Sequence, residues 1–108
     1  MPVPRPSGLP TLPPKEALIL ELLIDGGDLY GLELVARSKR RLKRGTVYVT
    51  LGRMEKKGLI ASRLEAPPPT AGGMPRRIYE ATAAGRRVLA AWTELTKVMG
   101  RLKPEFAR

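Results

Sequence analysis

The segment from Lys39 to Ile60, KRRLKRGTVYVTLGRMEKKGLI, joins a dense positive charge to a helical apolar pattern. Between Arg37 and Lys57 the chain has nine lysines and arginines and only one acidic residue, Glu55. Apolar residues nevertheless return at helix-like intervals, namely Leu42, Val47, Leu51 and Met54. A helix of this kind buries its apolar stripe against its own protein and leaves the charged face free. The segment is therefore predicted to pack on one side and to present positive charge to an acidic partner on the other.

The whole chain has the same excess of positive charge. Its 108 residues include 20 basic and 10 acidic side chains, which gives a formal net charge of +10. Such a charge is usually neutralised by a polyanion or an anionic membrane, and the length allows one small domain. The apolar runs at 17–20 and 22–24 are far shorter than the roughly 20 residues that cross a bilayer. Nucleic acid is therefore the leading partner, and no membrane contact is expected.

Two residue types that dominate catalytic and metal chemistry are absent. The chain has no cysteine and no histidine, which excludes disulfides, thiolate metal sites and imidazole acid–base chemistry. The ten carboxylates are scattered without a paired constellation. We therefore expect no catalytic residue, no metal and no cofactor, and predict that the protein is not an enzyme. The N-terminal MPVPRPSGLP lacks the apolar core of a signal peptide, which favours a cytoplasmic location.

Proline divides the N-terminal part of the chain. Residues 1–13 are rich in proline and are predicted to form an arm. A frayed terminus is the favoured interpretation of this arm, and insertion of Arg5 into a DNA groove is the alternative. A first helix is predicted over 14–25, before a pair of glycines. Apolar residues cover most of its circumference, so it is expected to be buried on more than one side.

The second and third helices follow at short intervals. Asp28 suits the N-cap of a helix over 29–38, in which Gly31 favours the close approach of another backbone. A basic connection leads to a third helix over 45–57, which the next glycine ends. These two helices are predicted to form a helix-turn-helix.

Two strands and a long helix complete the predicted fold. LIASRLE and RRIYEAT are predicted strands, and the irregular stretch APPPTAGGMP between them makes a long, loose hairpin. Thr82 then caps a helix over 83–103, which Pro104 ends. The fold class is mainly α with a small β-hairpin. The order α-α-α-β-β-α describes a winged helix-turn-helix whose wing is the hairpin.

A helical wheel separates the third helix into two faces. Its apolar side chains fall on the packing side. The opposite face and its flanks carry the predicted contacts with a major groove, which are Thr46, Val49, Thr50, Arg53, Lys56 and Lys57. Arg53 is the best candidate for base reading, because a guanidinium can bond two acceptors of guanine. Thr50 or Val49 can touch a thymine methyl, and the two lysines are expected to neutralise phosphates.

The candidate contacts extend to both sides of this helix. In the basic connection we expect phosphate contacts from Lys39, Arg40, Arg41, Lys43 and Arg44. Arg76 and Arg77 open the second strand of the hairpin, where they are placed to reach a minor groove or flanking phosphates. For Arg63 on the other strand an ordinary exposed position is favoured. The alternative for the whole surface is a solvated basic helix, but charge, helix-turn-helix order and a basic hairpin coincide.

The last predicted helix carries an apolar heptad seam. Its residues are spaced 4, 3, 4, 3 and 4 apart, and are Val88, Trp92, Leu95, Met99, Leu102 and Phe106. An unpartnered seam of this length leaves a sizeable apolar stripe, so a two-fold dimer along Val88 to Leu102 is predicted, with Gly100 weakening the last turns. A dimer places two reading helices roughly 34 Å apart. The predicted parts are an arm, a DNA-binding domain and a dimerisation helix with tail, over 1–13, 14–82 and 83–108.

Three segments of the chain, in order, resemble the PadR family of winged helix-turn-helix transcriptional regulators. LYGLEL at 29–34 resembles the family's L-x-G-Y-E-I, and RGTVYVTLGRMEKKGLI at 44–60 resembles P-G-T-L-Y-x-x-L-x-R-L-E-x-x-G-L-I. RRIYEATAAGRRVLAAW at 76–92 resembles R-R-K-Y-Y-x-L-T-E-A-G followed by the dimer helix. The chain departs from the pattern at Lys43-Arg44, where the family often has Ser-Pro, and in its longer wing tip.

The resemblance implies a homodimeric DNA-binding repressor with a single C-terminal dimerisation helix. Family members typically hold operator DNA through the reading helix, including the tyrosine that matches Tyr48, and through the arginines that match Arg76 and Arg77. Some members release DNA when an aromatic or drug-like compound enters a cavity near the dimer interface. Trp92 is a candidate to stack on such an effector, although a plain core position is favoured.

We therefore predict a transcriptional regulator that binds a roughly palindromic site in double-stranded DNA as a homodimer. Two alternatives stay open. One is a non-specific nucleic-acid-binding protein, and the other is a ligand-binding or protein-interaction module that kept the fold without operator recognition.

Overall fold

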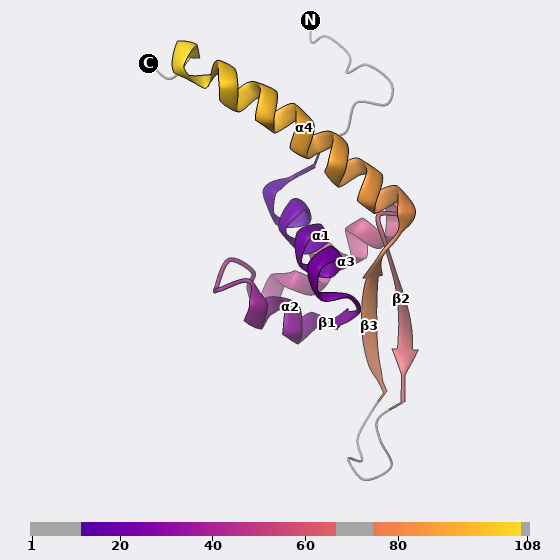
Figure 1. Cartoon of the computed structure of the whole chain (residues 1–108). Helices are drawn as coiled ribbons and strands as arrows, with labels where there is room; N and C mark the ends of the chain where they lie inside the picture. Colours follow the sequence, from indigo (N-terminus) through magenta and orange to yellow (C-terminus); the bar gives the residue numbers. More distant parts are fainter. Residues whose placement is uncertain (1–11, 67–74, 107–108) are drawn as a thin grey trace, which may run out of the picture.

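The computed structural model describes residues 12–66 and 75–106, and the side chains up to residue 98. Within these residues four helices and three strands follow one another (Figure 1). Their bounds are α1 Pro14–Gly26, β1 Leu29–Tyr30, α2 Gly31–Arg37, α3 Arg44–Lys56, β2 Ile60–Glu65, β3 Arg76–Ala81 and α4 Ala83–Phe106. The predicted arm up to residue 11, with Arg5, and the predicted wing tip at 67–74 lie outside the described residues.

The winged helix-turn-helix is confirmed, with one strand more than predicted. The strands form an antiparallel sheet in the order β1-β3-β2, in which Leu29 pairs with Tyr79 and Tyr30 with Ile78. The segment that begins the predicted second helix is therefore a short strand on the edge of the wing. The predicted order α-α-α-β-β-α omitted it, because two residues have no periodicity of their own.

The start of α2 also differs from the prediction. The helix begins at Gly31 with Tyr30 at its N-cap, and the backbone N–H of Tyr30 donates to the Glu33 carboxylate at 2.8 Å. The predicted cap at Asp28 is wrong. Asp28 instead accepts a hydrogen bond from the Arg63 guanidinium at 2.9 Å, because the pairing of β1 with β3 holds this part of the chain extended.

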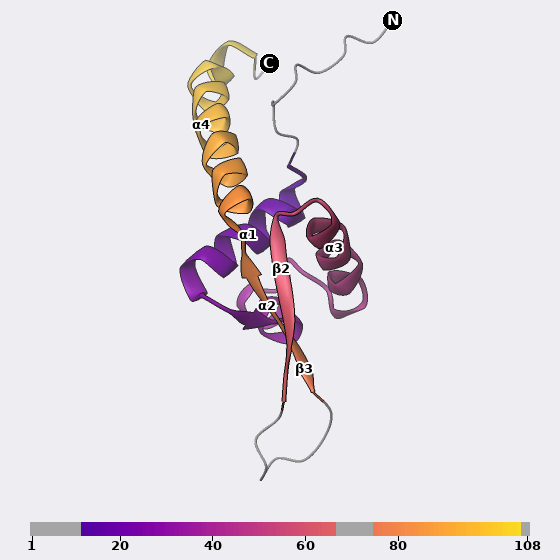
Figure 2. The same cartoon turned by 90° about the vertical axis from the view of Figure 1, so that its right-hand side faces the viewer.

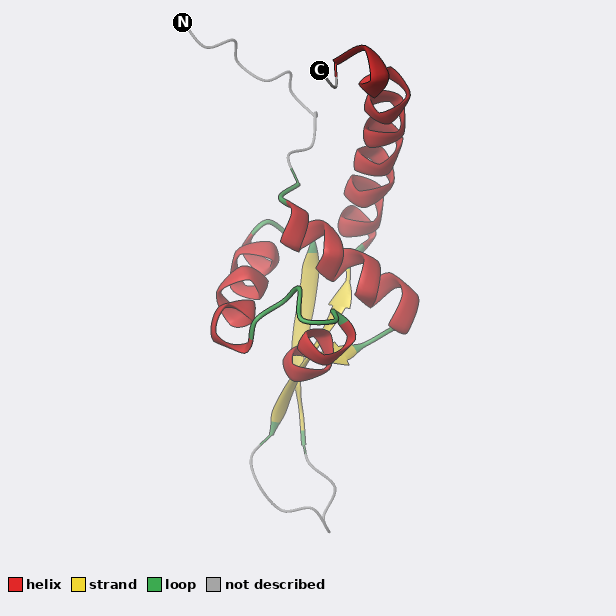
Figure 3. Cartoon of the chain, turned by 90° about the vertical axis from the view of Figure 1, so that its left-hand side faces the viewer, coloured by secondary structure: helices red, strands yellow, loops and turns green. Residues whose placement is uncertain are grey.

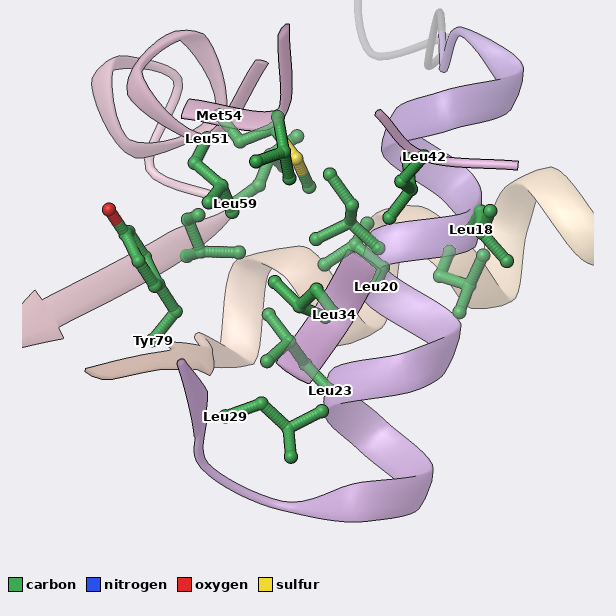
Figure 4. Packing of buried hydrophobic residues seen from close by; sticks show 14 of the residues in the cluster. Leu18, Leu20, Leu23, Leu29, Leu34, Leu42, Leu51, Met54, Leu59 and Tyr79 are labelled. Atoms are coloured by element: carbon green, nitrogen blue, oxygen red, sulfur yellow. The ribbon is translucent and has the colours of Figure 1, made fainter. Parts of the chain in front are cut away.

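The core is built around α1, which lies between the other elements. Ile19, Leu20 and Leu23 are almost completely buried, which confirms that this helix is covered on more than one side. Figure 4 shows leucines of α1 facing side chains of α2, α3 and the sheet, among them Leu34 and Leu51. These contacts hold the helix-turn-helix and the wing to one common centre.

The first turn of α4 is fixed to the sheet. The hydroxyl of Thr82 accepts the backbone N–H of Gly85 at 3.0 Å and donates to the carbonyl of Gly58 at 2.6 Å, so the predicted cap is confirmed. A Cβ at Gly85 would lie 2.1 Å from the carbonyl oxygen of Leu59, so only glycine allows this approach. The helix continues to Phe106, so the predicted end at Pro104 is wrong.

Three parts of the structure extend away from the core or have a side that the core does not cover. β2 and β3 project beyond the helices as a long hairpin, and α4 leads away from the opposite end of the molecule (Figure 2). Helix α3 lies beside β2 with its outer side uncovered by any other described element (Figures 2 and 3). The basic helix and the wing therefore belong to one side of a single scaffold.

Candidate nucleic-acid interface

Helix α3 divides its residues as the sequence predicts. Val47, Leu51 and Met54 are at most 1% exposed and pack into the core. On the other side Val49 is 57% exposed, and Arg53 is exposed as well. Thr46, Lys56 and Lys57 are exposed too, and Thr50 is half-buried. The predicted inward and outward faces of the helix are confirmed.

Tyr48 stands at the boundary between these faces, directly against α2. Its side chain is 50% exposed, and its ring lies over Gly31, where a Cβ would be only 2.6 Å from a ring carbon and 2.8 Å from the hydroxyl oxygen. The sequence predicted close approach at Gly31 by another backbone, but the approaching group is this tyrosine ring. The missing side chain at Gly31 therefore sets where the Tyr48 hydroxyl lies.

The basic connection between α2 and α3 is a tight turn with two residues in the left-handed region. The φ angles of Lys39 and Arg40 are +55° and +72°, values that cost roughly 1–3 kcal/mol for residues other than glycine. Ser38, which is not among the predicted residues, anchors the turn. Its buried hydroxyl donates to the Val35 carbonyl at 2.8 Å and accepts the N–H of Leu42 at 2.9 Å.

All the predicted cations of this connection lie on its outer side. The exposed residues are Lys39, Arg40, Arg41, Lys43 and Arg44, whereas Leu42 between them is buried. Five positive charges are therefore placed along this connection and at the start of α3.

The two wing arginines make different contacts. The guanidinium carbon of Arg76 lies 4.3 Å from the centre of the Tyr30 ring, a cation–π contact, and the hydroxyl of Tyr30 donates to Glu65. That hydrogen bond raises the pKa of Tyr30 above its ordinary value, because loss of the proton would set two anions side by side. Arg77 donates from Nη1 to the hydroxyl of Ser62 at 2.9 Å. Both guanidinium groups are thus held against neighbouring side chains of the sheet.

Two other predicted cations have partners within the protein. Lys57 binds both carboxylate oxygens of Glu16, at 3.0 and 3.1 Å, and Glu16 is only 3% exposed. The pair ties the end of α3 to the first turn of α1, a contact across 41 residues that local sequence patterns could not show. Arg63 lies within 2.9 Å of Asp28 and 4.0 Å of Glu80, which agrees with the ordinary hairpin position favoured for it.

Two hollows open on this side of the molecule. The first, of about 350 Å³, brings the helix tyrosine together with both wing arginines, and is lined by Tyr30, Gly31, Leu32, Glu33, Tyr48, Pro75, Arg76 and Arg77. The second, of about 340 Å³, lies between the start of α1 and the outer face of α3, and is lined by Pro13, Pro14, Lys15, Glu16, Thr50 and Arg53. The first hollow therefore brings Tyr48 of α3 together with the wing arginines, whereas Thr50 and Arg53 of α3 line the second.

The seam on α4 is described only in part. Val88, Trp92 and Leu95 are half-buried, and the first two pack against the edge of the core. Val98 is 43% exposed. The side chains of Met99 and Leu102 lie outside the described residues, so the dimer interface stays a prediction. Trp92 lines neither of the two hollows above.

Within the described segments, no group of three or more acidic side chains is arranged to hold a metal ion. None of the helices described is long and apolar enough to span a membrane.

A helix-turn-helix with an exposed cationic second helix, followed by an antiparallel wing, defines a winged helix-turn-helix protein. The model of the PadR-like family of transcriptional regulators matches residues 19–91 of the chain. The chain belongs to this family of transcriptional regulators.

Solved structures of this family have the same fold. A PadR family transcription regulator from Clostridium difficile is 29% identical, with a TM-score of 0.73 over 85% of this chain and 96% of that one. A PadR family regulator from Eggerthella lenta is 30% identical, with a TM-score of 0.60 over 82% of each chain. Bacillus subtilis PadR, solved in complex with operator DNA, is 23% identical, with a TM-score of 0.63 over 71% of this chain and 45% of that one. No curated protein sequence matches the chain.

Proposed function

We propose that this PadR-like regulator is a repressor that binds a roughly palindromic operator as a homodimer. The observation that carries the proposal is the outer face of α3, where Arg53 and Lys56 are exposed while the apolar face is buried in the core. A helix anchored in this way can enter a major groove, which is wide enough for it. The fold that this chain has in common with Bacillus subtilis PadR, whose structure contains operator DNA, supports the same interpretation.

The residues have separate roles in this proposal. Arg53 reads a guanine, and Thr46, Val49 and Thr50 make the neighbouring groove contacts. The Tyr48 hydroxyl binds a phosphate from the first hollow, together with Arg76 and Arg77. Phosphates are also neutralised by Lys39, Arg40, Arg41, Lys43, Arg44 and Lys56. Lys57 contributes less, because it is paired with Glu16.

The dimer and an effector complete the proposal. Two copies join along the seam of Val88, Trp92, Leu95, Met99 and Leu102, in a protein that works in the cytoplasm and catalyses no reaction. An aromatic or drug-like compound that enters near the dimer interface then releases the DNA; Trp92 is the candidate side chain to stack on it, although its packing against the core favours a plain core position. Sedimentation measurements on the full chain test the association state. A chain that stays monomeric at micromolar concentration contradicts the dimer.

The test of DNA recognition is a titration of the full chain by fluorescence anisotropy. One duplex carries the DNA immediately upstream of the protein's own gene, and a second carries the same bases in scrambled order. A specific regulator prefers the first duplex by about 10³-fold or more at physiological salt. Equal affinity for both duplexes, lost in parallel as salt rises, favours non-specific binding instead. Failure to bind either duplex favours a module that kept only the fold.

A further inference from the structure

A single serine hydroxyl connects the wing to the end of the reading helix α3. Ser62 in β2 accepts a hydrogen bond from Nη1 of Arg77 in β3 at 2.9 Å. The same hydroxyl donates to Oε2 of Glu55, in the last turn of α3, at 2.7 Å. Three elements that are separate in sequence are thus joined by two consecutive hydrogen bonds.

The strand register explains why Arg77 reaches this serine. Ser62 stands opposite Tyr79, and Arg77 lies two residues before Tyr79 on the same strand, so all three share one face of the sheet. Tyr79 is 5% exposed and points toward α3, which identifies this face as the one that packs against the reading helix (Figure 4). Arg76 alternates to the other face and lies over Tyr30. The two wing arginines are therefore held by different contacts, Arg77 by the Ser62 hydroxyl and Arg76 by the Tyr30 ring.

The chemistry of the link requires a hydroxyl at position 62. A guanidinium only donates hydrogen bonds and an ionised carboxylate only accepts them, whereas a hydroxyl does both at once. Alanine removes both bonds, and threonine can keep both. The bond to Ser62 uses one of the five N–H donors of Arg77, which leaves others for a phosphate. Because Glu55 and Arg77 are exposed, the link is expected to contribute little to the stability of the fold.

We propose that Ser62 is a positioning residue for DNA binding. Through its bond to Glu55 it fixes the Arg77 guanidinium relative to α3, so that the reading helix and the wing arginine meet one duplex together. An arginine side chain loses rotamer freedom when it binds, and ordering it beforehand removes part of that cost. This inference rests on the proposed function, because it assumes that α3 and Arg77 contact the same DNA.

A double-mutant cycle in the full chain tests the inference. The variants are Ser62→Ala, Ser62→Thr, Arg77→Ala and the Ser62→Ala/Arg77→Ala pair, titrated against the upstream duplex at one salt concentration. Ser62→Ala is expected to weaken binding about three- to tenfold, the effect of freeing one long side chain. Ser62→Thr restores affinity to near the original value. In the Arg77→Ala background the loss of the serine has no further effect, because the side chain that it positions is gone.

A matched control removes a hydroxyl that lies far from the wing. Thr96 on α4 donates to the Thr93 carbonyl at 3.0 Å, and Thr96→Ala is expected to leave DNA affinity unchanged. Thermal unfolding of every variant checks that all are folded. Unchanged binding by Ser62→Ala, or an equal loss with and without Arg77, overturns the inference. Binding by the unmodified chain with no loss in Arg77→Ala overturns it as well but leaves the proposed function in place, whereas no DNA binding by the unmodified chain overturns both.

Discussion

Substitution of Gly31 by alanine is expected to displace the Tyr48 side chain while changing the stability of the fold very little. The added methyl group would lie 2.6, 2.7 and 2.8 Å from three atoms of the Tyr48 side chain. Ordinary contacts between such atoms are about 3.5–4.0 Å, so the ring must retreat by roughly 1 Å. The ring is half exposed and free to swing toward solvent, so the backbone does not need to move. Alanine also favours a helix over glycine by up to about 1 kcal/mol, so the net change in unfolding free energy should stay within about 1 kcal/mol.

The effect on DNA binding is expected to be larger. In the proposed complex with DNA, a shift of roughly 1 Å takes the tyrosine hydroxyl out of hydrogen-bonding range of its phosphate, and a hydrogen bond to a charged group is worth about 1.5–3 kcal/mol. Gly31→Ala should therefore weaken binding to the upstream duplex by about tenfold or more, as measured by fluorescence anisotropy. Tyr48→Phe, which removes the same hydroxyl without crowding, should lose a similar amount.

A second glycine supplies the stability control. A methyl group at Gly52 on α3 would meet no neighbouring side chain or element within 4 Å, so Gly52→Ala should raise the denaturation midpoint through helix propensity alone. The reasoning about Gly31 is refuted if its alanine variant binds the duplex within twofold of the unmodified chain. It is also refuted if that variant unfolds, because the added methyl group would then have displaced the backbone and not the Tyr48 ring.

Five other substitutions have expected outcomes of their own. Lys57→Ala leaves a buried carboxylate unpaired and should lower the unfolding free energy by about 1–3 kcal/mol in denaturant titrations, whereas the neighbouring Lys56→Ala should change it by less than about 0.5 kcal/mol. In DNA titrations Arg53→Ala should relax base preference, while Lys56→Ala should weaken all duplexes about alike; identical losses would contradict these roles. Gly85→Ala should cost about 3 kcal/mol or more, since its methyl group would meet a backbone oxygen at 2.1 Å, and a fully stable variant would refute the packing at the start of α4. Burial raises the pKa of Tyr79 above its ordinary value of 10, so its contribution to stability is complete below pH 10 and falls as pH rises further; Tyr79→Phe should remove this part of the alkaline loss in thermal unfolding scans.

The elements that could be predicted are those with a repeating local signal. The faces of α3 follow from apolar residues three and four apart, and the cap at Thr82 from a threonine directly before a helical segment. Strand β1 could not be predicted, because the two residues that form it become a strand only by pairing with β3. The cap at Asp28 failed for the same reason, since an aspartate before a helical pattern does not show that a strand comes first.

The contacts that hold the candidate interface in place could also not be predicted from the sequence. A glutamate in the first turn of a helix is ordinarily exposed, yet Glu16 is buried, and Lys57, 41 residues away, pairs with it. Ser62 and Glu55 are ordinary polar residues until the strand register sets them beside Arg77. Sequence patterns thus locate the charged groups, whereas the partners that orient those groups depend on tertiary packing.

The close seating of Gly85 on Leu59 also bears on the geometry of an operator. Helix α4 starts directly from the wing strands, so the direction in which it leaves the domain is fixed by a contact between two backbones. In the proposed dimer joined along α4, the angle at this corner sets the distance between the two α3 helices. A small change of angle there would alter the number of base pairs between the half-sites that the pair can grip, with every residue that touches DNA left intact.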